Sequence, residues 1–297
     1  MSMFPTKILL AVDGSEEAES AARAGVGLAK KTGSELHVIY VGPLPTTMYV
    51  PESLDYMHEM AEHQGRLKLD EQLQKIKDMG GEVAEEHLVI GRPDAQIVEV
   101  AEEMGAGLVV VGSRGIGFVR RALLGSVSES TVHHAHCPVL VVRPREDDES
   151  LLGKRILVAT DDSEEARMAV EAAVELAEAT GAELHLVYAL TVEPPLPYPY
   201  PYAKERWEES LERAKKKART FVEEQAEQIR SKARIEIQAH LKFGLPGHEI
   251  VELGEELDAG IMILGSRGLG GIRRAQMGSV SDAVLRHAHS PVLVVRQ

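Results

Sequence analysis

The stretch that decides the fold is Val109–Ser128, VVVGSRGIGFVRRALLGSVS, and it recurs as Met262–Ser281, MILGSRGLGGIRRAQMGSVS. Each copy is a short apolar run followed by Gly, two residues, Gly, nine residues and Gly-Ser. The apolar run predicts a buried strand of a parallel sheet, and the Gly-Ser pair predicts the start of a helix. Identical spacing in two copies favours a ligand site over a simple connector, because connectors tolerate changes of length.

The glycines of this motif predict an anion site just beyond the strand. We expect them to turn the backbone with positive φ and to let it approach a ligand without an intervening Cβ. The free N–H groups and the positive dipole end of the following helix would face the same space, and phosphate is the anion that fits best. The motif glycines are Gly112, Gly115 and Gly125 in the first copy and Gly265, Gly268 and Gly278 in the second.

Composition places the chain among globular proteins with two domains. A chain of 297 residues with 44% hydrophobic and 27% charged residues can bury two cores. The net charge of −14 disfavours nucleic-acid and anionic-membrane partners. A single cysteine, Cys137, excludes an intrachain disulfide and fits a reducing compartment. Because neither a signal peptide nor a membrane-spanning apolar run is recognisable, we expect a cytoplasmic protein.

Strand and helix patterns alternate along each half of the chain. In the first half, strands are predicted at 7–13, 36–41, 82–90, 108–111 and 137–142, separated by helices. Ser15 is the expected N-cap of the first helix and Gly33 its C-terminal stop. This alternation predicts an α/β fold with a parallel sheet and helices on both faces.

The second half repeats the first, so the chain is a tandem duplication of one Rossmann-like or flavodoxin-like unit. KRILVATDDS from Lys154 repeats KILLAVDGS from Lys7, and ELHLVY from Glu183 repeats ELHVIY from Glu35. We expect one domain over residues 1–145, a charged linker over 146–153 and a second domain over 154–297.

A Pro- and Tyr-rich segment at 194–202 marks the insertion that lengthens the second copy. Its composition predicts an extended, stiff surface connector. An aromatic lid or a partner-docking site through Tyr198, Tyr200 and Tyr202 is the alternative.

Aspartates close the first strand of each half, at the edge where ligands of open α/β sheets bind. Asp13 and Asp161 could accept hydrogen bonds from ribose hydroxyls or help to hold a divalent cation. The competing interpretation is an acid that stabilises a helix dipole. Asp162 replaces Gly14 in the second copy, and we expect it to alter that turn.

The motif G-x₂-G-x₉-G-[ST] after a fourth strand, with Asp closing the first, resembles the ATP-binding branch of the universal stress protein family. The resemblance covers nearly the whole chain, as a tandem form. It implies a five-stranded parallel sheet of order 3-2-1-4-5 in each half, and ATP, with or without Mg²⁺, as the ligand. The second half departs from the first at two positions near the expected site, Asp162 and Ala189.

The site residues that the resemblance implies fall into matching sets in the two halves. Adenine would lie by Ala11, Val12, Asp13 and Val41, and by Ala159, Thr160, Asp161 and Ala189. Phosphates would lie on Gly112, Gly115, Gly125, Ser126 and Val127, and on Gly265, Gly268, Gly278, Ser279 and Val280. Val111 with Arg114, and Leu264 with Arg267, complete the two sets.

The arginines within or beside each glycine motif have two interpretations, which the sequence supports equally. They could pair with a triphosphate, or they could be solvated or form interdomain salt bridges. They are Arg114, Arg120 and Arg121 in the first copy and Arg267, Arg273 and Arg274 in the second.

The fifth strands are apolar and come last in each unit, so each should lie at a sheet edge that invites pairing. We expect residues 138–142 and 291–295 to cover each other's edges, as a pseudo-dimer within one chain. The family resemblance implies the same arrangement and adds a homodimer of the whole chain.

Metal and catalytic motifs are weak in this sequence. His133–Cys137, HHAHC, is interpreted as a helix end, because the matching RHAHS lacks the Cys and one His, so no metal site is expected. No P-loop lysine, Cys-x-x-Cys or GxSxG motif is found.

The leading hypothesis is a nucleotide-dependent stress sensor or switch. The alternatives are a slow ATPase or autophosphorylating enzyme, through Ser126 or Ser279, and a scaffold with structural nucleotide.

Overall fold

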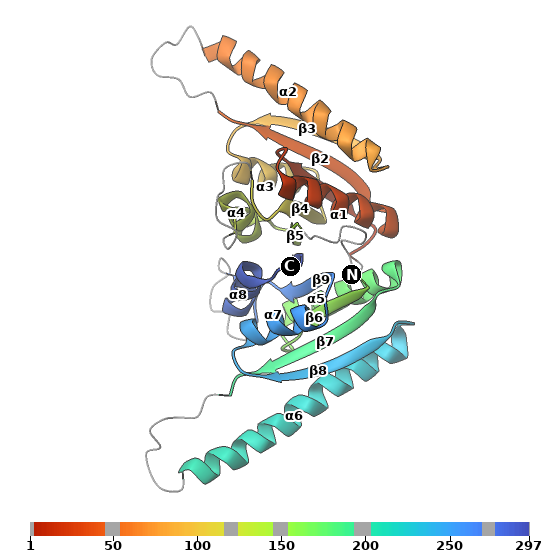
Figure 1. The fold of residues 1–297 in the computed structure, drawn as a ribbon, viewed down its shortest axis with the longest axis vertical. Helices are drawn as coiled ribbons and strands as arrows, with labels where there is room; N and C mark the ends of the chain where they lie inside the picture. Colours follow the sequence, from red (N-terminus) through yellow and green to blue (C-terminus); the bar gives the residue numbers. More distant parts are fainter. Residues whose placement is uncertain are drawn as a thin grey trace.

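A computed structural model describes residues 3–44, 54–115, 124–144, 154–192, 203–268 and 277–296, in which strands and helices alternate (Figure 1). The first half contains β1 (Lys7–Val12), α1 (Glu16–Thr32), β2 (Glu35–Gly42), α2 (Leu54–Asp78), β3 (Val83–Ile90), α3 (Pro93–Glu103), β4 (Leu108–Gly112), α4 (Ser126–His134) and β5 (Val139–Val142).

The second half repeats this order from β6 to β10. It contains β6 (Arg155–Ala159), α5 (Glu164–Thr180), β7 (Glu183–Leu190), α6 (Ala203–Lys232), β8 (Ile237–Phe243), α7 (Pro246–Glu256), β9 (Ile261–Gly265), α8 (Ser279–His287) and β10 (Val292–Val295). The predicted succession of strands and helices is therefore confirmed in both halves.

The bounds of α1 follow from its two capping residues, as predicted. The Ser15 side chain accepts a hydrogen bond from the Ala18 amide at 3.1 Å. Gly33 ends the helix in the left-handed conformation, with φ of 69°. α5 has the same pair of caps, Ser163 and Gly181, so the duplicated sequence produces duplicated helix ends.

All ten strands form one sheet of order β3-β2-β1-β4-β5-β10-β9-β6-β7-β8. Each half has the predicted 3-2-1-4-5 order, with parallel neighbours inside the half. The halves join where β5 and β10 pair antiparallel, with Leu140 opposite Leu293. The two apolar fifth strands thus cover each other's edges within one chain, as expected from their position.

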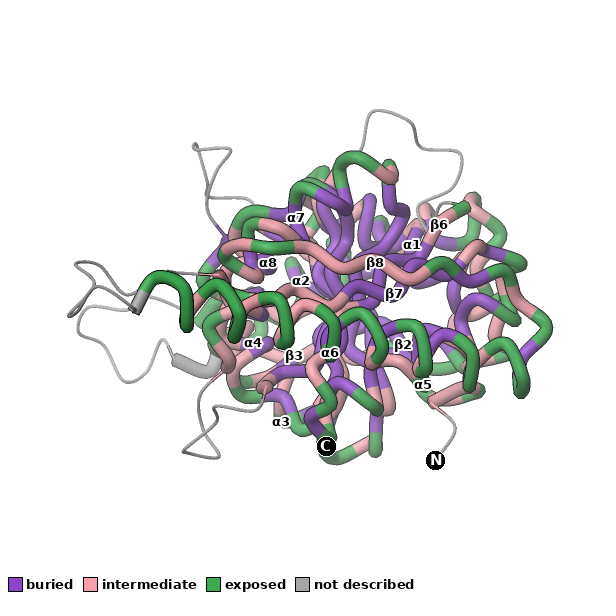
Figure 2. The backbone as a smooth tube through the Cα atoms, turned by 90° about the horizontal axis from the view of Figure 1, so that it is seen from below, coloured by how far each residue is buried: buried purple, intermediate pink, exposed green. Residues whose placement is uncertain are grey.

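Helices cover both faces of this sheet. α1, α2, α5 and α6 pack on one apolar cluster, and α3, α4, α7 and α8 pack on the other. Figure 2 shows buried strands in the interior and exposed turns along α6, which Figure 1 places at one end of the molecule, with α2 at the other. Both clusters contain residues of both halves, such as Ile8 with Ile156 and Leu9 with Leu157, so each core continues across the β5–β10 join.

Several sequence predictions fall outside the described residues. They are the domain boundaries around the 146–153 linker, the Pro/Tyr segment at 194–202 with Tyr198, Tyr200 and Tyr202, and the arginines Arg120, Arg121, Arg273 and Arg274. Within the described part of the chain, each helix is too short or too polar to cross a membrane.

Candidate functional site

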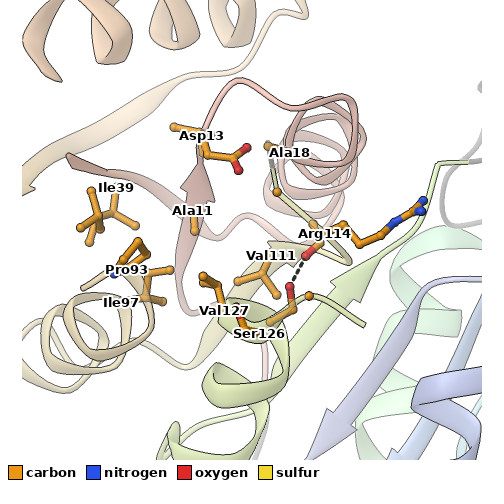
Figure 3. Close-up of a pocket in the computed structure, with 16 residues that line it drawn as sticks. Ala11, Asp13, Ala18, Ile39, Pro93, Ile97, Val111, Arg114, Ser126 and Val127 are labelled. Atoms are coloured by element: carbon orange, nitrogen blue, oxygen red, sulfur yellow. Dashed lines mark hydrogen bonds between the residues drawn. The ribbon is translucent and has the colours of Figure 1, made fainter. Parts of the chain in front are cut away.

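A cavity of about 300 Å³ lies at the carboxyl ends of β1, β2 and β4, next to the starts of α3 and α4 (Figure 3). This is the edge at which the sheet order changes direction between β1 and β4. The cavity is lined by Ala11, Val12, Asp13, Ala18, Ile39, Val41, Pro93, Ile97, Val111, Gly112, Arg114, Gly115, Gly125, Ser126, Val127 and Ser128.

Every first-half site residue that the family resemblance implies lines this cavity. The structure adds Ala18, Ile39, Pro93, Ile97 and Ser128, which sequence reasoning missed. Their signals were present: Ile39 lies two residues before Val41 and so shares its face of β2. Pro93 and Ile97 form the first turns of α3, the helix that enters the site after β3.

One side of the cavity is apolar. Ile39 and Val41 contribute from β2, Ile97 from α3, and Val127 from α4. The side chains of Ile39, Ile97 and Val127, labelled in Figure 3, lie around Ala11, whose small side chain leaves the floor open. The arrangement can hold a flat, largely apolar ring such as a nucleobase.

Asp13 provides the carboxylate of the site, and its orientation is fixed locally. One oxygen, Oδ1, accepts hydrogen bonds from the Ser15 amide at 2.9 Å and the Ser15 hydroxyl at 2.6 Å. The other oxygen, Oδ2, faces Gly115, where an added Cβ would come within 2.5 Å of it. The carboxylate is therefore held between the start of α1 and the glycine loop, as an acceptor at the cavity wall.

The start of α4 presents backbone donors without a side-chain cap. Its N-cap is Gly125, which offers no side-chain cap, so the first N–H groups of the helix lack the usual side-chain acceptor. The Gly125 amide donates to the Ser113 carbonyl at 2.8 Å, and the Ser128 hydroxyl donates to the Gly112 carbonyl at 2.6 Å. These two bonds hold the helix start against the end of β4, with the donors toward the cavity.

The prediction that the motif glycines have positive φ is wrong. Close packing, not backbone conformation, explains why glycine is required at these positions. None of the six lies in the left-handed region, and Gly125 and Gly278 have φ of −70° and −66°. A Cβ on Gly112 would meet the backbone of α1, 2.7 Å from the Glu17 carbonyl carbon. Gly112 is thus required for strand-to-helix packing, whereas Gly115 is required beside Asp13.

The second half builds the same local geometry. The Ser281 hydroxyl donates to the Gly265 carbonyl at 2.6 Å, and the Gly278 amide donates to the Ser266 carbonyl at 2.8 Å. The Asp161 Oδ1 atom accepts from the Ser163 amide at 3.0 Å, and Asp161 Oδ2 faces Gly268. The predicted residues of this half lie on the matching elements: Ala159, Thr160 and Asp161 at β6, Ala189 on β7, Leu264, Gly265, Arg267 and Gly268 at β9, and Gly278, Ser279 and Val280 at the start of α8.

Asp162 does not alter the turn that Gly14 makes in the first half, contrary to expectation. Its φ is 67°, and Gly14 has φ of 85°, so both lie in the left-handed region. Aspartate tolerates this conformation better than most side chains. Asp162 also forms an ion pair with Arg167 at 2.8 Å, which holds the turn from outside.

A polar contact distinguishes the second site. Thr160 stands where the first half has Val12, and its hydroxyl donates to Gln225 Oε1 of α6 at 3.2 Å. Val12, by contrast, is buried in the apolar cluster under α1. The second half therefore ties the end of its first strand to its long helix through a hydrogen bond.

Arg114 and Arg267 form ion pairs with glutamates of the same half. Arg114 Nη2 lies 2.8 Å from Glu17 Oε1, and Arg267 Nη2 lies 2.6 Å from Glu165 Oε1. Figure 3 shows the Arg114 side chain extending away from Asp13 and Ser126. The salt-bridge interpretation fits these two arginines, although the pairs lie within each half rather than between domains.

The histidine-rich segment is a helix end, as interpreted. α4 ends at His134, whose Nδ1 lies 2.8 Å from the Ser130 carbonyl oxygen, and His136 is exposed after it. His133 does approach Glu129 and Asp282, but Arg286 pairs with both of these carboxylates. The Arg286 guanidinium already occupies part of the space between these two carboxylates.

Comparison with known proteins agrees with the duplicated architecture. The Universal stress protein family model matches twice, over residues 5–143 and 153–296. The chain is 29% identical to universal stress protein Rv2005c of Mycobacterium tuberculosis over 304 residues, covering 98% of this chain and 97% of the relative. Universal stress protein YxiE of Bacillus subtilis is 36% identical over 146 residues, which are 46% of this chain and 98% of that protein.

A solved structure shares the whole fold. The crystal structure of a universal stress protein from Archaeoglobus fulgidus is 28% identical to this chain, with a TM-score of 0.67. The alignment covers 100% of this chain and 98% of that one. The tandem form therefore also occurs in relatives from other organisms.

Proposed function

This chain belongs to the universal stress protein family, and we propose that it binds ATP at the carboxyl edge of each half of its sheet. In this proposal the bound nucleotide sets the state of the protein, which acts as a sensor or switch in a stress response. In this proposal Mg²⁺ can enter the site together with ATP, bound to its phosphates.

One observation carries the proposal: three chemically distinct regions line one cavity, and they follow each other in the order of the base, sugar and phosphates of a nucleotide. The apolar wall of Ile39, Val41 and Ile97 suits adenine, and the fixed Asp13 carboxylate suits ribose hydroxyls. The uncapped start of α4 suits phosphate. No single region is specific, but their sequence in space matches base, sugar and phosphate.

We propose a second ATP site in the other half, with a different affinity. The same aspartate, glycine and helix-start geometry supports it. Ala189 replaces Val41 and leaves less apolar contact for the base, so we expect weaker binding there.

The rival function is a slow ATPase or an autophosphorylating enzyme. Ser126 and Ser279 are exposed at the starts of α4 and α8, where a phosphoryl group would lie. However, among the described residues that line the first cavity Asp13 is the one carboxylate, and its Oδ1 is occupied by Ser15. Within the described part of the chain the cavity therefore offers binding groups without an evident general base, and we favour a switch.

The decisive experiment for function is to identify the nucleotide and follow its fate. Untagged protein is denatured directly after purification and its small-molecule content is measured by mass spectrometry, with an adenine nucleotide as the expected result. ADP release from added ATP over hours then separates a switch from an enzyme, because a switch leaves ATP intact. Absence of nucleotide, together with no thermal shift on adding ATP and Mg²⁺, would contradict the proposal.

Partner binding separates a switch from a scaffold with structural nucleotide. Proteins captured from a stressed lysate should differ between ATP-loaded and nucleotide-free protein if the nucleotide controls interaction.

A further part of the proposal is that the chain forms a homodimer in the cytoplasm. Because β5 and β10 already pair with each other, that dimer must use a different surface, and light scattering after gel filtration tests it.

A further inference from the structure

Two histidines face each other across β2 and β3, on the outer part of the sheet. His37 of β2 lies directly opposite Glu85 of β3, and His87 follows two residues later on the same face of β3. The two imidazole rings are stacked, with centroids 5.9 Å apart and an interplanar angle of 21°. One ligand atom from each of His37, Glu85 and His87 lies within 4.8 Å of the others.

The two imidazoles present nitrogen atoms that the rest of the described structure does not satisfy. His37 is 4% exposed, and its Nδ1 atom has no hydrogen-bond partner among the described residues. His87 Nε2 is also buried and unpartnered there. Buried polar atoms are rarely left without a partner, because each costs about 1–3 kcal/mol. Both orphaned nitrogens belong to this one cluster, so a missing common partner explains both.

Carboxylates on both sides of His37 favour a cationic partner. Glu35 Oε2 lies 3.4 Å from His37 Nε2, and Glu85 Oε2 lies 3.6 Å from His37 Nδ1. If Nε2 carries the proton and donates it to Glu35, the Nδ1 lone pair faces the Glu85 carboxylate. Two electron-rich atoms at this distance repel each other unless a cation lies between them.

The second half of the chain provides an internal comparison. His185 and His240 occupy the matching positions, but there His185 Nδ1 and His240 Nε2 are 2.9 Å apart and share a hydrogen bond. Gln238 stands in place of Glu85, and its side-chain amide donates to Glu183. The two nitrogens that lack a partner in the first half therefore bond to each other in the second, where the carboxylate is absent. Among the described residues of the second half a different imidazole nitrogen, His185 Nε2, is buried without a hydrogen bond, 3.5 Å from Glu183 Oε2.

We propose that His37 Nδ1, His87 Nε2 and Glu85 bind one divalent transition-metal cation of the Zn²⁺ class. Two imidazoles and one carboxylate form a ligand set that suits Zn²⁺, with water in the fourth position. Glu35 holds His37 in the required tautomer by accepting from Nε2, as second carboxylates commonly do at zinc sites. Tetrahedral zinc needs its ligand atoms about 3.3 Å apart, so the cluster contracts on binding.

The geometry permits that contraction and gives the ion a path. The Glu85 side chain is 62% exposed, and β3 is an edge strand of the sheet. The carboxylate can therefore move inward while the buried His37 stays in place. The site shares no residue with the described lining of the proposed nucleotide cavity, which lies further along β2 toward its carboxyl end.

Zinc titration of the full-length, untagged and metal-stripped protein tests the proposal. Competition with a zinc-responsive dye should show one high-affinity equivalent in the wild type. Glu85→Gln copies the second half and removes the charge of an exposed side chain, so it keeps the fold, which circular dichroism checks. It should weaken zinc by at least about tenfold, and Glu35→Gln should weaken it by about tenfold through His37.

A matched control excludes surface binding. His248, Glu249 and Glu252 form an exposed cluster on α7, and His248→Gln should leave the high-affinity equivalent unchanged. Co²⁺ in place of Zn²⁺ should give the intense visible absorption of a four-coordinate ion in the wild type and lose it in Glu85→Gln. Equal zinc affinity in wild type and Glu85→Gln, or no high-affinity equivalent, would overturn the proposal.

Discussion

Arg143 and Arg296 exchange helix-capping contacts between the two halves of the chain. Arg143 follows β5, and its Nη2 donates to the Leu285 carbonyl at the end of α8 at 2.7 Å. Arg296 follows β10, and its Nη1 donates to the carbonyls of His133, at 3.2 Å, and Ala135, at the end of α4. Each helix that opens toward a proposed phosphate site is therefore capped at its other end by the opposite half.

Removing either arginine should destabilise the chain. Arg143 is 9% exposed, so Arg143→Met strands buried carbonyl oxygens at the end of α8 while keeping most of the side-chain volume. We expect a loss of about 1–3 kcal/mol in the free energy of unfolding, and a similar loss for Arg296→Met. Urea unfolding measures it. Arg213→Met is the control, because the exposed Arg213 bonds Ser210 of the same helix and its loss should cost under about 0.5 kcal/mol. Equal effects in all three variants would contradict the capping role.

Two glycines of one motif should respond differently to alanine. Gly112→Ala drives a Cβ into the backbone of α1, 2.7 Å from the Glu17 carbonyl carbon, and should cost about 1–3 kcal/mol of folding stability. Gly115→Ala meets the Asp13 side chain instead and should lower nucleotide affinity with little change in stability. Thermal unfolding and ATP titration of both variants separate the two effects. If Gly115→Ala binds ATP like the wild type, the role of the Asp13 carboxylate in the site is wrong.

Cys137 should react slowly with alkylating reagents. Burial raises the pKa of its thiol to about 11, although the neighbouring Arg296 acts in the opposite direction. At pH 8 the reactive thiolate is then scarcer than in an ordinary cysteine by one to two orders of magnitude. Iodoacetamide labelling followed by mass spectrometry should be slow in buffer and fast in denaturant. Rapid labelling of the folded protein would show that the thiol is accessible as thiolate.

The His185–His240 pair should make stability fall at mildly acidic pH. Burial lowers the pKa of both histidines, and for His240 the nearby His185 and Lys242 lower it further while Glu183 and Glu256 oppose. The unfolded chain therefore takes up protons below about pH 6.5, before the folded chain does. Stability is complete above that pH and declines as pH falls toward the folded pKa values.

A variant isolates this contribution. Urea unfolding between about pH 7.5 and 5.5 should show a shallower decline for His240→Gln than for the wild type, because one such group is gone. His248→Gln, at an exposed histidine, is the matched control and should keep the wild-type slope. Identical slopes in all three proteins would mean that the pair already carries a proton when folded.

The sequence was sufficient for most of the fold, because local signals and duplication agreed. Ser15 and Gly33 gave the ends of α1 correctly, and the apolar fifth strands indicated the pairing that joins the halves. Most of the cavity wall could also be predicted, since Asp13 and the glycine motif occupy fixed places at strand ends.

Features that depend on distant backbone could not be predicted. The reason for Gly112 lies in the backbone of α1, nearly one hundred residues earlier, and Arg143 contacts carbonyls of α8 in the other half. His37 and His87 resemble ordinary strand residues, because their proximity depends on the register of β2 against β3, including its shift after Leu36. The pattern of apolar and polar residues along the sequence does not indicate such long-range contacts.

Calorimetric titration of ATP into matched cavity-filling variants tests the central claim most directly. Val41→Trp places a large side chain where we propose adenine lies in the first half, and Ala189→Trp does so in the second, while Leu67→Trp alters an exposed position on α2. The wild type should bind two equivalents of ATP, each cavity variant should lose one, and Leu67→Trp should lose none. Unchanged ATP binding in both cavity variants, or no binding by the wild type, would contradict nucleotide recognition at this edge of the sheet.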